Sequence, residues 1–172
     1  CDGGNADDLG CGCFEAGPSG CDNTCGSTLE FDECGECGGA NACFVAGLSL
    51  GAFDSSGSLE VLYDFGAGVA GFQFDVTGLA LTGGSGGAAG DAGLTVSAGG
   101  ATVVGFSFTN SEIAAGSGVL TVLSFSDVTA GTTELSLGNF GAVTSAAGVE
   151  YTTTASGSVD HGDADCAGDY YG

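Results

Sequence analysis

The cysteines are gathered at one end of this chain, and their distribution predicts where the chain divides. Eight of the nine cysteines lie within the first 43 of 172 residues, and none lies between Cys43 and Cys166. A segment of about 40 residues buries too little apolar surface to fold alone, so it needs covalent or metal cross-links. We therefore predict a Cys/Asp/Gly-rich, disulfide-stapled module over 1–43, a body over 44–159 and an acidic tail over 160–172.

The eight cysteines of the N-terminal segment are expected to form four disulfides, in a pairing that the sequence does not determine. They are Cys1, Cys11, Cys13, Cys21, Cys25, Cys34, Cys37 and Cys43. Zinc binding and redox catalysis are the alternatives, because Cys34-Gly-Glu-Cys37 has the spacing that both use. The other cysteine spacings do not repeat this pair, and no βαβ pattern surrounds it. Disulfides indicate an oxidising compartment, so we expect a secreted or cell-surface protein.

The charge of the chain is entirely of one sign. It has no lysine or arginine and 22 aspartates and glutamates, which gives a formal net charge of −22. Nucleic acids and anionic membrane surfaces bind to basic faces, so both are excluded as partners. No apolar run reaches the ~18 residues of a membrane span.

Bound calcium is the expected source of positive charge, because the protein supplies none. Carboxylates on glycine-bearing turns offer the oxygens that calcium prefers, although no segment matches the EF-hand pattern and the number of ions stays undetermined. The alternative is that these acids are solvated surface charge. The candidate ligands are Asp2, Asp7 and Asp8; Asp22 and Asp32; and Asp160, Asp163, Asp165 and Asp169.

The body reads as β-strands throughout, since apolar and polar residues alternate between glycine- and serine-rich turns. Strong candidates are 58–65, 69–76, 101–108 and 118–125, and weaker ones are 44–53, 79–82, 94–97, 134–137 and 149–155. Turns every 8–12 residues with this period predict an all-β, antiparallel β-sandwich. The one short helical candidate is 110–115, and the glycine-rich stretch 83–90 is expected to be a flexible surface loop.

Catalysis is not expected. His161 is the only histidine, and Lys, Arg and Trp are absent, so few groups could perform acid–base work or stabilise an oxyanion. His161 is expected to be a surface residue, with metal ligation or a raised pKa as the alternative. The hydroxyl-rich stretches 129–133 and 152–156 are candidates for O-linked glycans.

Two segments carry resemblances to known families. Val69-Ala-Gly-Phe-Gln-Phe-Asp-Val76 and Gly116-Ser-Gly-Val-Leu-Thr-Val-Leu-Ser-Phe125 resemble the cohesin-like module of cellulosomes and related bacterial surface proteins. This resemblance implies a nine-stranded sandwich of jelly-roll type over 44–159. It also implies a module that recognises a protein partner or displays a carbohydrate-binding face.

The second resemblance concerns the cysteine-rich ends. Asp32-Glu-Cys-Gly-Glu-Cys-Gly-Gly-Ala-Asn-Ala-Cys43 is similar to the Cys-Gly-x-Cys-x-Gly unit of bacterial extracellular proteins related to thrombospondin type 3 repeats. In those proteins Asp-Cys-x-Gly-x-x-x-Gly precedes the unit, and 165–172 reads Asp-Cys-Ala-Gly-Asp-Tyr-Tyr-Gly. The denser Asp-x-Asp strings of the type 3 repeat are absent. The resemblance implies that the chain stops midway through a second cysteine-rich unit.

These features predict a structural role. Cys166 is expected to bond to a neighbouring subunit or repeat, and the alternative is that it folds back onto the N-terminal module and leaves another cysteine free. We predict a subunit or repeat of a bacterial extracellular filament or stalk, linked head to tail as a homopolymer through calcium-binding, cysteine-rich junctions. The rival hypothesis is a cohesin-like module that binds a protein or a carbohydrate.

Overall fold

The computed structural model describes residues 10–12 and 16–171. The chain divides into two compact units, Cys1–Cys43 and Phe44–Gly172. Five residues of the sequence predictions lie outside the described part: Cys1, Cys13, Asp2, Asp7 and Asp8.

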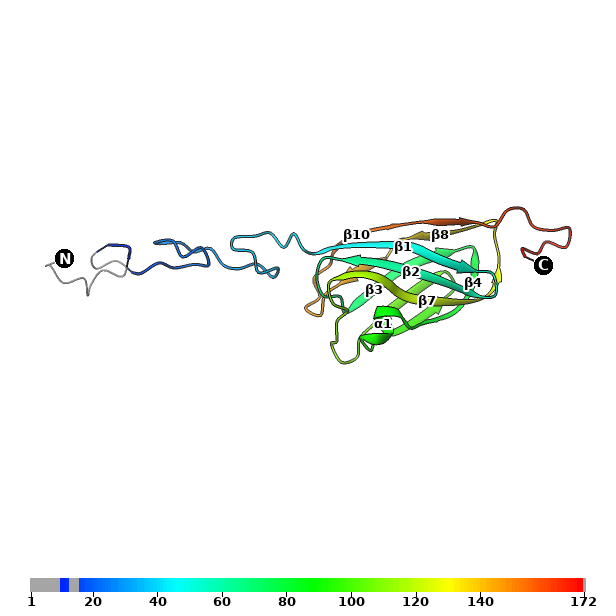
Figure 1. Ribbon diagram of the computed structural model, residues 1–172, viewed down its shortest axis with the longest axis horizontal. Coiled ribbons are helices and arrows are strands. Elements are labelled where there is room, and N and C mark those ends of the chain that lie inside the picture. Colours follow the sequence, from blue (N-terminus) through cyan, green and yellow to red (C-terminus); the bar gives the residue numbers. More distant parts are fainter. Residues whose placement is uncertain (1–9, 13–15, 172) are drawn as a thin grey trace. The chain divides into compact units, whose positions relative to one another are not determined.

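The second unit is a two-layer β-sandwich (Figure 1). One sheet has the order β10-β1-β2-β7-β4, with β10 at Thr152–Ser156, β1 at Val45–Asp54, β2 at Ser58–Phe65, β7 at Gly116–Val128 and β4 at Leu79–Ser85. The other has the order β11-β8-β3-β6-β5, with β11 at Ser158–Asp160, β8 at Thr132–Ser136, β3 at Gly71–Thr77, β6 at Thr102–Phe106 and β5 at Thr95–Gly99; β9, at Ala142–Thr144, also pairs with β3. The predicted all-β sandwich is confirmed, with eleven strands in the described residues where the resemblance implied nine.

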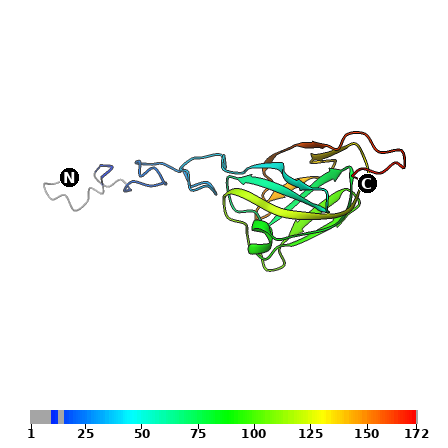
Figure 2. The same cartoon turned by 45° about the vertical axis from the view of Figure 1, so that its right-hand side comes forward.

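One pair of strands departs from the antiparallel pattern. β10 runs parallel to β1, in a register from Val45 opposite Thr152 to Ser49 opposite Ser156. β11 then continues in the same direction in the other sheet and pairs with β8. The chain therefore enters the sandwich at Phe44 and leaves it after Asp160 at the opposite end, as both views show (Figures 1 and 2).

The core lies between the two sheets and follows the sequence alternation. In β3, Phe72, Phe74 and Val76 are buried, whereas Gln73 and Asp75 face outward. Burial of each such apolar side chain stabilises the fold by roughly 1.5–3 kcal/mol. The largest fully buried apolar side chains are Phe65, Phe74, Leu59, Leu120, Leu123, Val61, Val69, Val76, Val103 and Val143.

A short helix replaces part of the expected flexible loop. β4 extends to Ser85, and α1 (Gly87–Asp91) follows it and packs against β7 with Ala89 fully buried. Gly87 has φ 62°, and a Cβ there would lie 2.6 Å from the Leu120 carbonyl oxygen, so only glycine fits. Burial of Ala89, rather than helical periodicity, holds this segment.

The short helical candidate at 110–115 does not form a helix. Ile113 is buried and exchanges two backbone hydrogen bonds with Val69, of 2.9 and 2.8 Å, which keeps the segment extended.

Within the described residues, no helix has the length and apolar character needed to cross a membrane.

The first unit has little regular structure and is held by disulfides. The bonded pairs are Cys11–Cys25, Cys21–Cys37 and Cys34–Cys43. Each loop overlaps the next along the sequence, so the cross-links tie successive turns together. Cys34 and Cys37 are bonded to other cysteines, so zinc binding and redox catalysis by that pair are not supported. The predicted disulfide-rich module is confirmed, and disulfides fit an oxidising extracellular compartment.

Candidate functional site

A five-residue loop at Asp32–Glu36, here called the module loop, is built around one carboxylate. Oδ1 of Asp32 accepts the amides of Cys34 and Glu36 at 2.9 and 2.8 Å. The Asp32 amide donates to the Glu36 carbonyl at 2.9 Å, and the Gly35 amide donates to the Asp32 carbonyl at 2.9 Å. Oδ2 accepts the Asn41 amide at 2.8 Å. The carboxylate thus organises the loop that carries Cys34.

The tail contains the same loop at Asp165–Asp169, here called the tail loop. Oδ1 of Asp165 accepts the amides of Ala167 and Asp169 at 2.8 and 3.0 Å. The Asp165 amide donates to the Asp169 carbonyl at 2.9 Å, and the Gly168 amide donates to the Asp165 carbonyl at 3.0 Å. All four bonds join the same relative positions as in the module loop. The glycine at the fourth position has φ 93° here and 79° in the module loop, a conformation that favours glycine.

The two loops also share their electrostatics. In each, the amide four positions after the aspartate is the main cause that lowers the pKa of the Asp32 or Asp165 carboxyl below its ordinary value of 3.8. They differ in the cysteine, which is third in the module loop and second in the tail loop. Cys34 is bonded to Cys43, whereas Cys166 is exposed and carries no disulfide.

A ring cluster fixes the tail to the end of the sandwich. The Nε2 atom of His161 lies 2.8 Å from the Thr133 hydroxyl, and Nδ1 lies 2.9 Å from the Tyr171 hydroxyl. The Phe53 ring is 4.8 Å from the His161 ring, 5.9 Å from the Tyr171 ring and 5.4 Å from the Phe125 ring that it stacks on. The tail loop therefore lies between two anchoring residues, His161 and Tyr171.

His161 has an anchoring role in this geometry. Burial lowers the pKa of its imidazole below 6.5, and the nearby Asp160 carboxylate opposes that shift. Both ring nitrogens lie within hydrogen-bonding distance of a hydroxyl, so both take part in holding the tail. The fully buried Thr133 and the C-terminal Tyr171 are partners that sequence spacing did not identify.

The predicted calcium ligands in the described part of the chain do not converge. Across residues 10–12 and 16–171, no three His, Cys, Asp or Glu side chains form a group that could hold a metal ion. Oδ1 of Asp160 accepts the Gly162 amide at 2.8 Å, and a hydrogen bond from the Ser27 side chain is the main cause that lowers the pKa of Asp22. Asp163 and Asp169 are exposed. Calcium binding therefore stays a prediction.

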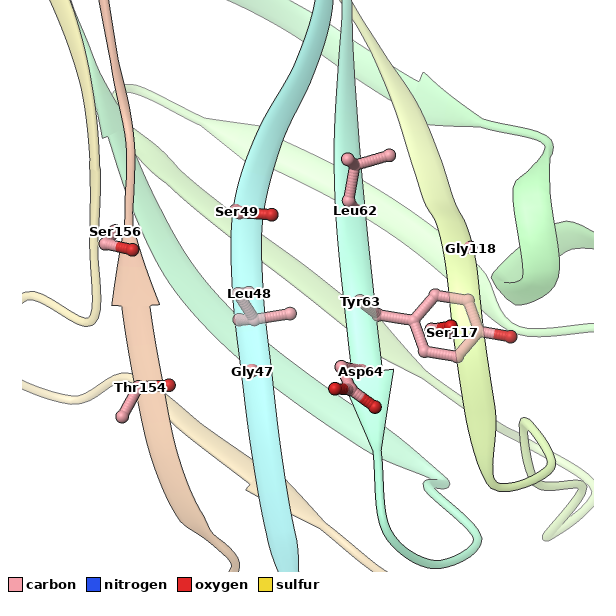
Figure 3. Close-up of a pocket in the computed structure, with 10 residues that line it drawn as sticks. All are labelled: Gly47, Leu48, Ser49, Leu62, Tyr63, Asp64, Ser117, Gly118, Thr154 and Ser156. Atoms are coloured by element: carbon pink, nitrogen blue, oxygen red, sulfur yellow. The ribbon is translucent and has the colours of Figure 1, made fainter.

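A shallow groove of about 450 Å³ runs over the sheet that contains β10, β1, β2 and β7 (Figure 3). Its lining is mostly glycine, serine and threonine, and the larger side chains are Leu48 on β1 and Leu62, Tyr63 and Asp64 on β2. Asp64 is the single carboxylate among the ten lining residues, which include no histidine or cysteine. This chemistry suits polar contacts but supplies no acid–base pair.

A strip of apolar side chains lies on the outer side of the other sheet. Val104 and Phe106 on β6 are half-buried, and Phe108 just after the strand is 80% exposed. The Phe106 and Phe108 rings meet edge to face at 4.8 Å. Three neighbouring apolar side chains on one outer face form a candidate contact surface.

No family model matches the sequence, and no curated protein matches it. Among solved structures, the chain is similar to a non-cellulosomal cohesin from the hyperthermophilic archaeon Archaeoglobus fulgidus, with 15% identity over 66% of this chain and 88% of that chain and a TM-score of 0.47. The thrombospondin type 3 resemblance of the cysteine-rich ends stays a prediction.

Proposed function

We propose that this chain is a non-catalytic structural module that associates with other copies end to end through its cysteine-rich loops. The observation that carries the proposal is the identity of the hydrogen-bond frameworks of the module loop and the tail loop. A loop that reproduces part of a cysteine-rich unit and presents a free thiol is suited to complete such a unit with a second chain.

The placement of the tail supports this role. Phe44 and the tail lie at opposite ends of the sandwich, and β1 between them is ten residues long, which corresponds to about 30 Å. Contacts made at the two ends extend an assembly instead of closing it into a dimer. The ring cluster around Phe53 and His161 holds the tail loop in place for that contact.

The proposed link is a disulfide between Cys166 and a cysteine of another copy outside the three bonded pairs. It requires that the N-terminal module of that copy keeps a thiol, so that the fourth disulfide expected from the sequence does not form within it. The two thiols lose two protons and two electrons to the oxidant of the extracellular compartment, and one S–S bond forms. The calcium predicted from sequence would reduce repulsion where the acidic segments of two copies meet. No enzymatic step is included in the proposal.

The test is covalent assembly of the full chain under non-reducing conditions. We expect oligomers that a reductant converts to monomers, and peptide mapping that finds Cys166 bonded to a cysteine of another copy. Cys166→Ser should abolish the oligomers, whereas Ala167→Ser, at the next exposed position, should leave them intact. Quantitative alkylation of Cys166 in native, monomeric material would refute the link.

Recognition of a different protein is the second candidate function, and the exposed Phe108 favours it. A partner docked on Val104, Phe106 and Phe108 would cover this apolar strip. Phe108→Ser should then weaken partner binding at least tenfold while Cys166-linked assembly is unchanged. Protein that stays monomeric yet binds such a partner would favour this candidate over self-association.

A further inference from the structure

Acidic residues are unevenly distributed over the sandwich. None lies within residues 92–111, the stretch that includes β5 and β6, although the chain carries a net charge of −22. The nearest carboxylate in the same sheet belongs to Asp75 on β3, which accepts a 2.8 Å hydrogen bond from Thr102. The β5 edge is therefore separated from the acids of its own sheet by the whole of β6.

The edge strands of the two sheets differ in how they are protected against pairing with another chain. Charged residues, bulges and very short strands are the usual protections. β11 has three residues and includes Asp160. β4 has register irregularities on both sides of Leu81.

The remaining edges, β10 and β5, are regular and uncharged over five residues each. Glu150 lies two positions before β10 and Asp160 lies four positions after it, in β11, so carboxylates flank this edge on both sides along the chain. β5 is flanked by one acid, Asp91 in α1, four positions before Thr95, and the next acid after β5 is Glu112. It pairs with β6 without irregularity from Thr95 to Gly99, and it contains no proline.

We propose that β5 is a self-association edge, which pairs antiparallel with β5 of a second copy and joins the two β5-containing sheets into one. Pairing about Ser97 sets Thr95 opposite Gly99 and Val96 opposite Ala98 of the second copy. Val96 and Ala98 are half-buried against the core of their own chain, and the second strand covers them further. The exposed backbone amides and carbonyls of both edges gain partners.

The charge distribution favours a second copy of the chain as the partner of the β5 edge. A basic partner would be drawn to the acidic ends of the chain, where 13 of the 22 acids lie in residues 1–43 and 160–172. Another copy of this polyanion is repelled there and approaches at least cost through an edge strand that has no carboxylate of its own. The contact is isologous and lateral, so it is independent of the end-to-end link through Cys166.

The test is sedimentation equilibrium of the full chain carrying Cys166→Ser, with the module disulfides intact, from about 1 μM to about 1 mM at an ionic strength near 0.15 M. We expect a reversible monomer–dimer equilibrium. Ser97→Glu adds a carboxylate at the centre of the exposed edge and should weaken the dimer at least tenfold, because like charges directly opposite each other are destabilising. Ser124→Glu adds the same charge at an exposed position on β7, which is paired on both sides, and should change the dissociation constant less than about twofold.

Hydrogen exchange provides the second readout, at a low and a high protein concentration. The amides of 95–99 should exchange more slowly in the concentrated sample, and this protection should be lost in Ser97→Glu and kept in Ser124→Glu. A chain that stays monomeric throughout the range, or a dimer that Ser97→Glu leaves unchanged, overturns the proposal. Cys166-linked polymers without this dimer would refute the β5 contact and leave the proposed function standing.

Discussion

Replacing Phe53 with alanine should release the tail from the sandwich without unfolding it. The Phe53 ring contacts two rings of the tail, those of His161 and Tyr171, at 4.8 and 5.9 Å. An aromatic pair contributes roughly 0.5–1.5 kcal/mol beyond area burial, so the two contacts together stabilise the docked tail by about 1–3 kcal/mol. A loss of that size raises the population of the undocked tail about five- to 150-fold.

Amide hydrogen exchange measures this population directly. The His161 amide donates to the Gly131 carbonyl at 2.8 Å, and it should exchange faster in Phe53→Ala by that factor. Amides of the central strand β2 should change far less. Phe140→Ala is the matched control, because Phe140 is 84% exposed and lies outside the ring cluster. Unchanged exchange at His161, or an equal acceleration in β2, would show that the rings do not anchor the tail.

Two further predictions concern the same unit. Burial holds the pKa of His161 below its unfolded value of about 6.5, so the unfolded chain binds more protons than the folded chain near that pH. The free energy of unfolding should therefore rise as the pH increases from about 5 to 7. In His161→Gln, urea unfolding should show a smaller rise over the same pH range. Gly105→Ala should destabilise the sandwich by about 1–3 kcal/mol, because the new Cβ would lie 2.1 Å from Cζ of the buried Phe72. A melting temperature equal to that of the unmodified chain would contradict this packing.

The strands that the sequence identified are those with a long alternating pattern. The range predicted for β2, 58–65, is the observed one, and 118–125 lies inside β7. β9 and β11 have three residues each, too few for a period of two to be recognised. The parallel pairing of β10 with β1 depends on contacts more than 100 residues apart, which local periodicity does not encode.

The tail shows the same division between local and long-range information. The matching aspartate and glycine spacing of 32–35 and 165–168 is a local signal, and both segments form the same loop. The anchoring of His161 by Thr133 joins residues 28 positions apart and follows from the fold alone. The acids suggested ion binding because of their number, but several of their carboxylates accept nearby backbone amides, which a count of charges does not reveal.

The parallel pairing of β1 with β10 has a mechanical consequence. β1 is the first strand of the sandwich along the chain and β10 is the last but one, and the two lie side by side. The chain enters the sandwich at one end and leaves it at the other. Tension applied between the two ends acts along the strands, so the five β1–β10 residue pairs are loaded in shear and must break together. In a hairpin pulled from its open end, by contrast, the hydrogen bonds break one at a time. A stretched array of such domains would resist extension at this pair of strands.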